Sequence, residues 1–404
     1  MNKSILFVVN NLNIGGPQKS LLSLLYNFPD DYQIDIIVLN KELGLQKYLP
    51  SNVNLIHTSD EIPLLMLNKK KIFKLVFNNL FLNLKLSLKS IIVLMGNLFS
   101  NSLVKKKQTF WVENKHLIKH DKYKKYEFAI GVSGGHSIMY IVDFVDAKYK
   151  VGWIRTEYQN LNRDLELDKN YFEELNLILS VSEKCSEKFI EIFPEQFSKV
   201  HTFYNPLPYK MYEQLFNDEI KSNTKQKETI IISTISRLDK NKGFDLLIEA
   251  AKHLRNNQYK YIWNIYGVGP QKKAILKQIK LNQLENYVHL RGFEFNTGAI
   301  LKNTDILVHP SKFEGKSNTI DEAKYYGIAI VSTNFPTVSE QLTNNVNAII
   351  TEMDGKDLYK GIAKMINFPK IRKLIECNLK EQEKASQDIF VEFMSIIESG
   401  AIND

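Results

Sequence analysis

The sequence has few of the residues that mark secreted, zinc-binding or collagen-like proteins. Only two of its 404 residues are cysteine, Cys185 and Cys377, and neither belongs to a Cys-x-x-Cys pair. A disulfide framework and a cysteine zinc site are therefore not expected, and a reducing, cytoplasmic compartment fits best. Glycine (18) and proline (11) are too few for collagenous or low-complexity character, while 44% apolar and 24% charged residues are ordinary for a folded globular protein.

Long hydrophobic runs are also missing. The apolar stretch at residues 5–9 is cut short by Asn10, Asn11 and Asn13 before any small-residue cleavage site, so it predicts a first β-strand and not a signal peptide. Between residues 69 and 125 the longest uninterrupted apolar run covers residues 91–95. A membrane-spanning helix needs about 20 predominantly apolar residues, and none is expected in this segment.

Acidic residues are scarce in residues 69–125. The whole chain carries 53 Lys plus Arg against 45 Asp plus Glu, a formal charge of +8. This segment alone has 14 lysines against Glu113 and Asp121, a charge of +12, which leaves −4 for the other 347 residues. The basic character is therefore local, and it coincides with many Leu, Ile and Phe residues.

Two interpretations of this basic apolar segment stay open. Amphipathic helices on an anionic membrane surface would satisfy both the lysines and the apolar face, because each basic residue near such a surface contributes about 1 kcal/mol. A pair of core helices with solvated lysines is the simpler alternative. Nucleic acid is not expected as a partner, because the segment contains no arginine and no recognised nucleic-acid motif.

Short β-branched runs alternate with helical stretches along most of the chain. Near-continuous apolar strands separated by helices indicate parallel sheets covered on both faces, and hence an α/β fold. The alternation is interrupted at the polar residues 217–228, which predict a linker region before a new first strand. We expect an N-terminal domain at residues 1–205, a C-terminal domain at 206–386, and an amphipathic helix at 387–404. The expected strands are residues 5–9, 34–39, 53–56, 128–132, 151–154, 177–181, 230–235, 261–266, 306–308 and 328–332.

The first strand leads to a turn able to bind an anion. Gly15 and Gly16 permit a tight turn, and Pro17 suits the first position of a helix whose N-terminal N–H groups would point at a phosphate. A Gly-Gly pair between a strand and a helix is often only a turn, however. The G-x-G-x-x-G and P-loop spacings are absent, which argues against dinucleotide and ATP-loop sites.

The second domain offers more polar residues at its expected strand ends, where ligands of open α/β sheets bind. Arg237 and Lys242, in the loop after strand 230–235, could hold one phosphate between a guanidinium and an ammonium. After strand 306–308 come Glu314, which could accept sugar hydroxyls, and Glu322, which could accept ribose hydroxyls. Two surface cations and a helix-dipole partner are the simpler explanations. The capping residues of the helix that carries Glu322 are expected to be Ser317, Asn318 and Thr319.

Four runs of the second domain carry a resemblance to a known family. They read SRLDKNKGFDLLIEA, NIYGVGP, VHLRGF and DILVHPSKFEGKSNTIDEAKYYGIAIVST. They resemble the C-terminal domain of the family-4 retaining glycosyltransferases, including the two glutamates separated by seven residues, here Glu314 and Glu322. The stretches GGPQKSLLSLL and SEKCSEKFIEIFP…FYNPL are similar to that family's N-terminal domain and interdomain hinge, so the resemblance covers nearly the whole chain.

The resemblance implies the GT-B fold, in which two Rossmann-like domains with parallel sheets face each other across a cleft and the C-terminal helix returns to the N-terminal domain. It implies that Arg237 and Lys242 hold the donor diphosphate. It also implies that Glu322 binds the ribose and that Glu314 contacts the transferred sugar. Glu314, Arg237 and Lys242 are the expected catalytic residues. The remaining donor contacts are expected at Gly16, Gly292, Phe293, Ser317, Asn318 and Thr319.

The chain departs from the family pattern at one position. Family members commonly carry a histidine near the reacting sugar in the segment that matches residues 152–157, and here that position is Arg155. An arginine cannot act as a base near neutral pH, but it could hold a sugar hydroxyl or a phosphate, which permits a negatively charged acceptor. His136, in the run VSGGHS, is a second candidate on the acceptor or sugar side, with a structural histidine as its alternative.

These expectations describe a retaining hexosyl- or N-acetylhexosaminyl-transferase. It would move a sugar from a nucleotide-diphosphate donor, expected to be a UDP-sugar, to a lipid-linked or polymeric cell-surface glycan. No metal or other cofactor is expected, since cations and helix dipoles can stabilise the leaving diphosphate. The enzyme would be cytoplasmic, or peripheral at the inner face of the cell membrane. Two alternatives stay open: a nucleotide-sugar epimerase of the same fold, and a catalytically silent donor-binding partner of another transferase.

Overall fold

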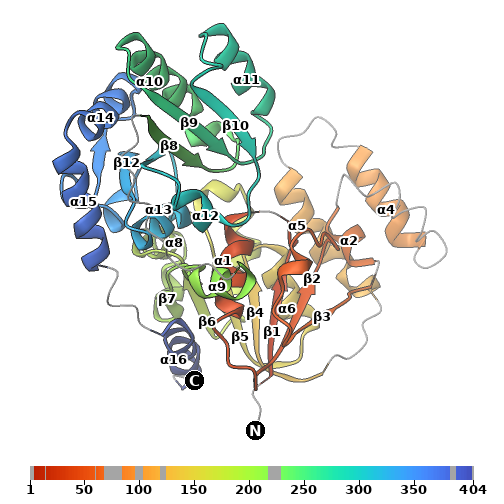
Figure 1. Ribbon diagram of the computed structural model, residues 1–404. Coiled ribbons are helices and arrows are strands. Elements are labelled where there is room, and N and C mark those ends of the chain that lie inside the picture. Colours follow the sequence, from red (N-terminus) through yellow and green to blue (C-terminus); the bar gives the residue numbers. More distant parts are fainter. Residues whose placement is uncertain are drawn as a thin grey trace. The chain divides into compact units, whose positions relative to one another are not determined.

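The computed structural model of the protein describes residues 4–13, 15–59, 61–67, 84–95, 103–118, 124–216, 229–382 and 388–402. They form two compact units, each built around one parallel β-sheet (Figure 1). The first unit comprises Met1–Pro206 and Asp388–Asp404, and the second comprises Leu207–Gln387. The expected linker at residues 217–228 and the lysines at 69–71 lie outside the described residues.

The sheet of the first unit has seven parallel strands in the order β3-β2-β1-β4-β5-β6-β7. Its central strands are buried along most of their length, which explains why their sequences are apolar runs and do not alternate. The register aligns Val8 of β1 with Gly131 of β4, and Gly131 with Gly152 of β5. The carboxyl ends of these three strands therefore lie side by side. The strands are β1 (Ser4–Val9), β2 (Gln33–Val38), β3 (Val53–Ile56), β4 (Tyr126–Val132), β5 (Ala147–Ile154), β6 (Leu177–Ser180) and β7 (Val200–Thr202).

Helices cover this sheet, and the last of them comes from the end of the chain. Phe393 of α16 is fully buried, and its ring centroid lies 6.2 Å from that of Phe7 in β1 and 5.2 Å from that of Phe203. The predicted return of the C-terminal helix to the N-terminal domain is confirmed. The helices of this unit are α1 (Gly16–Leu25), α2 (Glu61–Leu65), α4 (Leu84–Met95), α5 (Leu103–Asn114), α6 (His136–Phe144), α7 (Leu165–Glu173), α8 (Glu183–Ile192) and α16 (Ile389–Ile402).

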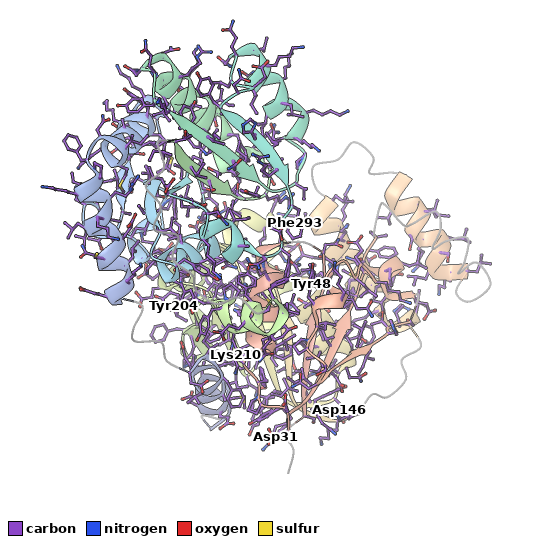
Figure 2. All side chains as sticks on the ribbon, in the orientation of Figure 1. Asp31, Tyr48, Asp146, Tyr204, Lys210 and Phe293 are labelled. Atoms are coloured by element: carbon purple, nitrogen blue, oxygen red, sulfur yellow. The ribbon has the colours of Figure 1, made fainter. Side chains whose placement is uncertain are left out.

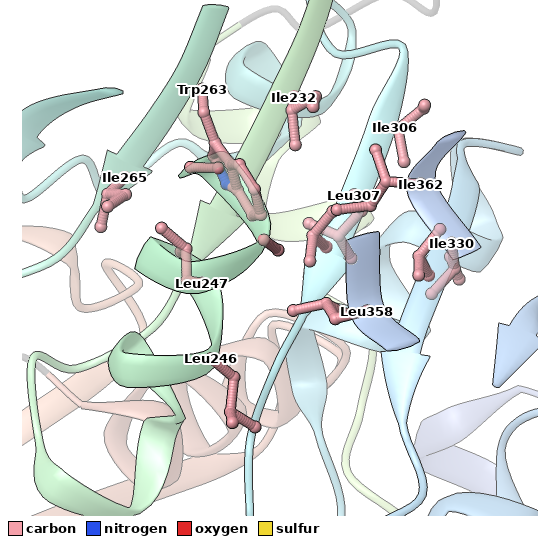
Figure 3. Packing of buried hydrophobic residues seen from close by; sticks show 14 of the residues in the cluster. Ile232, Leu246, Leu247, Trp263, Ile265, Ile306, Leu307, Ile330, Leu358 and Ile362 are labelled. Atoms are coloured by element: carbon pink, nitrogen blue, oxygen red, sulfur yellow. The ribbon is translucent and has the colours of Figure 1, made fainter. Parts of the chain in front are cut away.

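The second unit has a six-stranded parallel sheet in the order β10-β9-β8-β11-β12-β13. Helices α10 and α14 pack against each other, and Leu247 and Leu358 from them are fully buried with Trp263 of the sheet (Figure 3). The strands are β8 (Ile230–Ile235), β9 (Tyr261–Tyr266), β10 (Val288–Gly292), β11 (Ile306–His309), β12 (Ala329–Thr333) and β13 (Ile349–Thr351). The helices are α9 (Tyr209–Phe216), α10 (Phe244–Asn256), α11 (Lys272–Leu281), α12 (Thr297–Leu301), α13 (Asn318–Tyr325), α14 (Gly355–Asn367) and α15 (Pro369–Gln382).

All ten strands expected from the sequence are present, and the α/β class with two parallel sheets is confirmed. Three further strands, β7, β10 and β13, were not expected. Each of them lies at an edge of its sheet and has only three to five residues. A strand with one neighbour and a half-exposed face needs no continuous apolar run.

Candidate functional site

The loops that follow β8 and β11 meet at the carboxyl edge of the second sheet. Gly243, with a φ of +63°, ends the first loop, and a Cβ there would lie 1.8 Å from the carbonyl oxygen of Pro310. Only glycine fits at this approach. The N–H of Lys312 donates to the carbonyl of Asn241 at 2.8 Å, which joins the two loops directly.

This approach brings Lys242 and Glu314 together. Nζ of Lys242 lies 2.5 Å from Oε1 of Glu314, and the same oxygen accepts a hydrogen bond of 2.9 Å from Oγ of Ser311. Nε2 of His309 lies 3.2 Å from it, off the axis of a good hydrogen bond. Three groups thus converge on one carboxylate oxygen. Within the described residues no hydrogen bond or ion pair reaches Oε2, which is left to accept from a ligand hydroxyl.

Glu314 is held in its charged form. Burial by itself would raise the pKa of this carboxyl, but the contact with His309 and the positive charge of Lys242 outweigh burial and lower the pKa to about 2. At neutral pH the group is therefore a carboxylate. It can accept hydrogen bonds or stabilise positive charge nearby, and it has no proton to give to a reacting group.

Arg237 is not part of this contact. Its side chain is 68% exposed, and its Nη2 lies 3.2 Å from Oδ2 of Asp239. The two predicted phosphate ligands, Arg237 and Lys242, share a loop but bind different carboxylates. An exposed guanidinium with one acidic neighbour keeps donors that a phosphate could use.

The N-terminus of α13 is fixed by a side chain that sequence reasoning missed. Ser317 is the N-cap, as expected, and accepts from the N–H of Ile320 at 3.4 Å. The amide of Gln341 accepts from the N–H of Ser317 at 2.9 Å, and donates to its carbonyl and to Oδ1 of Asp321, both at 2.8 Å. Lys316 lies 3.0 Å from the other oxygen of Asp321. Gln341 is 24 residues from Ser317, and no sequence signal connects them.

Among the other predicted residues of this cap, Asn318 is the first residue of α13, and the hydroxyl of Thr319 donates to the carbonyl of Ile235 at 3.2 Å. This contact ties the helix start to the end of β8. The cap therefore lies at the same sheet edge as the Lys242–Glu314 pair.

Glu322 is almost fully buried, with 2% of its surface exposed. Its carboxylate accepts a hydrogen bond from the hydroxyl of Thr297, which in turn lies 2.8 Å from the hydroxyl of Tyr212 in α9. The pKa of Tyr212 is raised well above its usual value by burial and by the nearby negative charge of Glu322. Thr297 and Tyr212 carry no recognisable motif, and only the packing of α9, α12 and α13 brings them to Glu322.

Gly292 is the last residue of β10, and Phe293, labelled in Figure 2, follows it. Gly292 has a φ of +82°, and a Cβ there would meet no atom of the described residues within 4 Å, which leaves space beside this backbone. Phe293 is 40% exposed. An open backbone edge next to an exposed ring suits a planar base, which is the role that the resemblance implies.

Two predicted residues of the first unit lie at helix starts. Gly16 is the first residue of α1, preceded by the N-cap Gly15 and followed by Pro17. His136 is the first residue of α6. His136 is buried and its ring lies 5.2 Å from that of Trp111. Burial, together with the charges of Arg163 and Lys107, lowers the pKa of His136 to about 3, so the imidazole is neutral at neutral pH.

Arg155 follows the end of β5, and its guanidinium lies over the ring of Trp153, 4.3 Å from the centroid. Its Nη1 is shielded from solvent and finds no hydrogen-bond partner in the described parts of the chain. The arginine that takes the place of the family histidine is therefore at a strand end, as expected for a ligand residue of a parallel sheet.

The described residues contain neither a cluster of metal ligands nor a helix that could span a membrane. In the described parts of the chain, no group of three or more His, Cys, Asp or Glu side chains could hold a metal ion. The acidic residues at 164–168 have other roles, since Asp164 caps α7 and Asp168 binds Arg163. Among the helices that the structure describes, none is long and apolar enough to cross a membrane.

The sequence of the second unit matches a known family. Residues 216–382 match the family described as glycosyl transferases group 1, which confirms the resemblance found in the motifs. One relative is the N-acetylgalactosamine-N,N'-diacetylbacillosaminyl-diphospho-undecaprenol 4-alpha-N-acetylgalactosaminyltransferase of Campylobacter jejuni, 27% identical over 216 residues, which are 53% of this chain and 57% of the relative. The chain therefore matches a little over half of that relative's length.

Solved structures match along nearly the whole chain. A TarM variant of Staphylococcus aureus, in complex with UDP, fondaparinux and alpha-GlcNAc-glycerol, has a TM-score of 0.67 at 16% identity and covers 98% of this chain and 99% of its own. HepE of Anabaena, in complex with UDP-glucose, has a TM-score of 0.67 at 15% identity and covers 98% of both chains. At these identities the likeness shows the fold, which is the GT-B fold expected from the resemblance.

Proposed function

We propose that this chain is a retaining glycosyltransferase that uses a UDP-sugar and acts on a lipid-linked or polymeric cell-surface glycan. The observation that carries the proposal is the pair of Lys242 and Glu314 at the carboxyl edge of a sheet whose sequence matches the group 1 glycosyltransferases. The pair supplies a cation for the leaving diphosphate and a carboxylate oxygen for the transferred sugar. The exposed Arg237 supplies a second cation at the same edge.

In the proposed reaction, the acceptor hydroxyl oxygen forms a bond to the anomeric carbon on the face from which the diphosphate leaves. The bond between the anomeric carbon and the diphosphate oxygen breaks, and its electron pair stays on that oxygen. The same oxygen then takes the proton of the acceptor hydroxyl. No protein nucleophile or general acid is needed, which agrees with a Glu314 that carries no proton. Cations beside the leaving diphosphate stabilise the charge that develops on it.

The UDP donor is supported by the fold, because TarM and HepE have UDP or UDP-glucose bound in their structures. A thermal-shift screen against UDP-, GDP-, ADP- and dTDP-sugars tests it. Since a ligand stabilises the folded state in proportion to the logarithm of its concentration over Kd, UDP-sugars should give the largest shift. A larger thermal shift with a sugar linked to another nucleotide would identify a different donor.

Activity is tested on three single variants, Lys242→Ala, Arg237→Ala and Glu314→Gln, with Lys240→Ala as a matched control. Lys240 lies in the same loop but is exposed and outside the proposed site. Each of the three variants should lose about 100-fold or more in turnover, and the control should keep it. Full activity in all three would refute the assignment. Epimerised donor formed without any acceptor would instead identify an epimerase.

Metal independence is part of the proposal, because helix α13 and the cations of the site could stabilise a diphosphate without a metal. Sugar transfer should continue unchanged after dialysis against EDTA. Loss of transfer, restored by Mg²⁺ or Mn²⁺, would show that a metal takes part.

We also propose that α4 contacts an anionic membrane surface, where a lipid-linked acceptor would be found. Leu84, Leu88 and Ile92 are 53%, 49% and 70% exposed and recur every four residues, so they form one apolar stripe along the helix. Lys85 lies exposed beside the stripe. An exposed apolar stripe with neighbouring lysines has the chemistry of an interfacial helix.

Vesicle sedimentation tests this contact, with phosphatidylglycerol-containing vesicles compared against pure phosphatidylcholine. The double variant Leu88→Ser/Ile92→Ser should bind anionic vesicles about tenfold more weakly or worse, because two apolar side chains no longer enter the interface. Leu281→Ser in α11 is the control, since Leu281 is 65% exposed, between Leu88 at 49% and Ile92 at 70%. Equal binding by both variants would contradict the proposal. Donor affinity should be unchanged in each.

A further inference from the structure

The first unit contains two shielded arginines with opposite surroundings. Arg163 is paired with an acid: Nη2 lies 2.6 Å from Oδ1 of Asp168, and Nε donates to Oδ2 at 2.7 Å. Burial by itself would lower the pKa of Arg163, but the hydrogen bonds to Asp168 raise it. Among the described residues no carboxylate pairs with Arg155, whose guanidinium lies over the ring of Trp153.

This difference matters because an uncompensated charge away from water is costly. Burial lowers the pKa of Arg155 to about 9, so the guanidinium still carries its charge at neutral pH. The face of an indole ring offsets part of the lost hydration, but it accepts no hydrogen bond from Nη1. A folded protein that keeps a shielded cation without a counter-ion is suited to receive an anion from outside.

Other unpaired polar atoms gather at the same strand ends. Oδ1 of Asn10 follows β1, and Nε2 of His136 follows β4 across the turn Ser133-Gly134-Gly135. Both atoms are buried, and neither has a hydrogen-bond partner among the residues that the structure describes. Strands β1, β4 and β5 are neighbours, with Val8, Gly131 and Gly152 in one row. Three unsatisfied polar groups thus follow three adjacent strands, at the edge where α/β sheets bind ligands.

We propose that this strand-end site, centred on Arg155, binds a phosphate group of the acceptor substrate. The proposal rests on the proposed function, and it adds that the acceptor is anionic. The guanidinium offers a planar pair of donors that matches two phosphate oxygens. Helix α6 follows β4, the strand next to β5, and its start contributes backbone N–H groups and the positive end of the helix dipole. A neutral His136 can donate or accept one further hydrogen bond.

The test measures phosphate binding apart from donor binding. The protein is first saturated with UDP, and farnesyl phosphate is then titrated by calorimetry, with neutral farnesol as the parallel titrant. The variants are Arg155→Gln and Arg155→Lys, and the control is Lys148→Gln, which removes one exposed positive charge from the other end of β5. Near-UV circular dichroism of each variant verifies that the first unit is folded.

The Kd for farnesyl phosphate should rise about tenfold or more in Arg155→Gln, because a charged hydrogen bond is lost. It should rise less in Arg155→Lys and stay unchanged in Lys148→Gln, while UDP affinity stays unchanged in all variants. The inference is overturned if farnesol binds as tightly as farnesyl phosphate, if Arg155→Gln binds phosphate normally, or if it is UDP affinity that falls. If the unchanged protein does not bind UDP, the proposed donor is wrong, and the same titration without UDP still decides the role of Arg155.

Discussion

The carboxylate of Glu314 predicts a pH window for stability. Its pKa falls from 4.5 in ordinary surroundings to about 2 in the fold. A depressed carboxyl pKa stabilises the folded state above the unfolded pKa, and this stabilisation is lost as the pH falls through the folded pKa. We expect Glu314→Gln to lower the free energy of unfolding at pH 7, and the deficit relative to the unchanged protein to shrink between about pH 4.5 and about pH 2.

Urea unfolding from pH 7 down to about pH 3 measures this deficit. Glu285→Gln is the matched control, since Glu285 is an exposed glutamate of the same unit. Its deficit should be small at every pH. A deficit in Glu314→Gln that stays constant down to pH 3 would show that lost packing, and not lost charge, destabilises the variant.

Thr297 should support ribose binding indirectly, because its hydroxyl positions the carboxylate of Glu322. Thr297→Val removes the hydroxyl that donates to a buried carboxylate, and we expect it to cost about 1–3 kcal/mol of unfolding free energy. If Glu322 binds the ribose, the variant should also lose much of the preference for UDP over 2′-deoxy-UDP. Calorimetric titration with both nucleotides measures this preference. Tyr212→Phe, one step further from Glu322, should change it in the same direction but less.

An unchanged preference in a destabilised Thr297→Val would leave Thr297 with a structural role alone. The comparison therefore separates positioning of Glu322 from support of the surrounding core. Both readouts come from the same protein preparation, so loss of fold cannot imitate loss of preference.

At the scale of residues, the sequence predicted what lies within short motifs. Lys242 and Glu314 were both expected to face the donor, and the structure places them 2.5 Å apart. Ser311 and His309 lie in the run VHPSKFEG, yet nothing in that run shows that both reach Oε1 of Glu314. Such contacts depend on the meeting of two loops, which spacing along the chain does not encode.

At the scale of elements, the approach of the β8 and β11 loops depends on Gly243. A Cβ at this position would overlap the carbonyl of Pro310 at 1.8 Å, and the φ of +63° is unfavourable for other residues. Gly243→Ala should therefore lower the stability of the second unit by more than the roughly 1–2 kcal/mol of backbone strain alone, and it should also abolish donor binding. Chemical unfolding and UDP titration measure the two effects.

Gly292→Ala is the matched control for this prediction. Gly292 also has a positive φ, +82°, but no atom of the part of the chain that the structure describes lies within 4 Å of its Cβ position. Gly292→Ala should lower the free energy of unfolding only by the backbone strain, roughly 1–2 kcal/mol. Equal losses in the two variants would mean that the overlap with Pro310 is relieved by a small shift of the loop.

The success of strand prediction also depends on position in the sheet. All ten expected strands are present because, in the central strands, both faces are buried and the sequence is continuously apolar. The edge strands β7 and β10 were missed because their sequences, VHT and VHLRG, place polar residues between apolar ones, and β13 was missed because its apolar run is short, the strand having only the three residues IIT. Their pairing is decided by the neighbouring strand and not by their own composition.

At the scale of the whole molecule, the first unit is completed by residues that follow the second unit in sequence. Phe393 of α16 is fully buried among Phe7, Phe28 and Phe203, with ring centroids 5.2–6.2 Å away. The amphipathic pattern of the last segment predicted a helix, and the resemblance predicted its return to the first domain. The pattern alone could not name the partner, since any apolar surface would satisfy it.

Phe393→Ala should therefore destabilise the first unit while the second unit keeps its stability. Loss of a fully buried phenylalanine costs about 3–5 kcal/mol, whereas Val391→Ala on the same helix should cost about 0.5 kcal/mol or less, because Val391 is 58% exposed. Unfolding is followed with and without UDP, which by the proposed function raises only the transition of the second unit. Phe393→Ala should then lower the midpoint of the transition whose midpoint UDP does not change. A single transition that responds to both the variant and UDP would show instead that the two units unfold together, so that α16 stabilises the donor site as well as the sheet it covers.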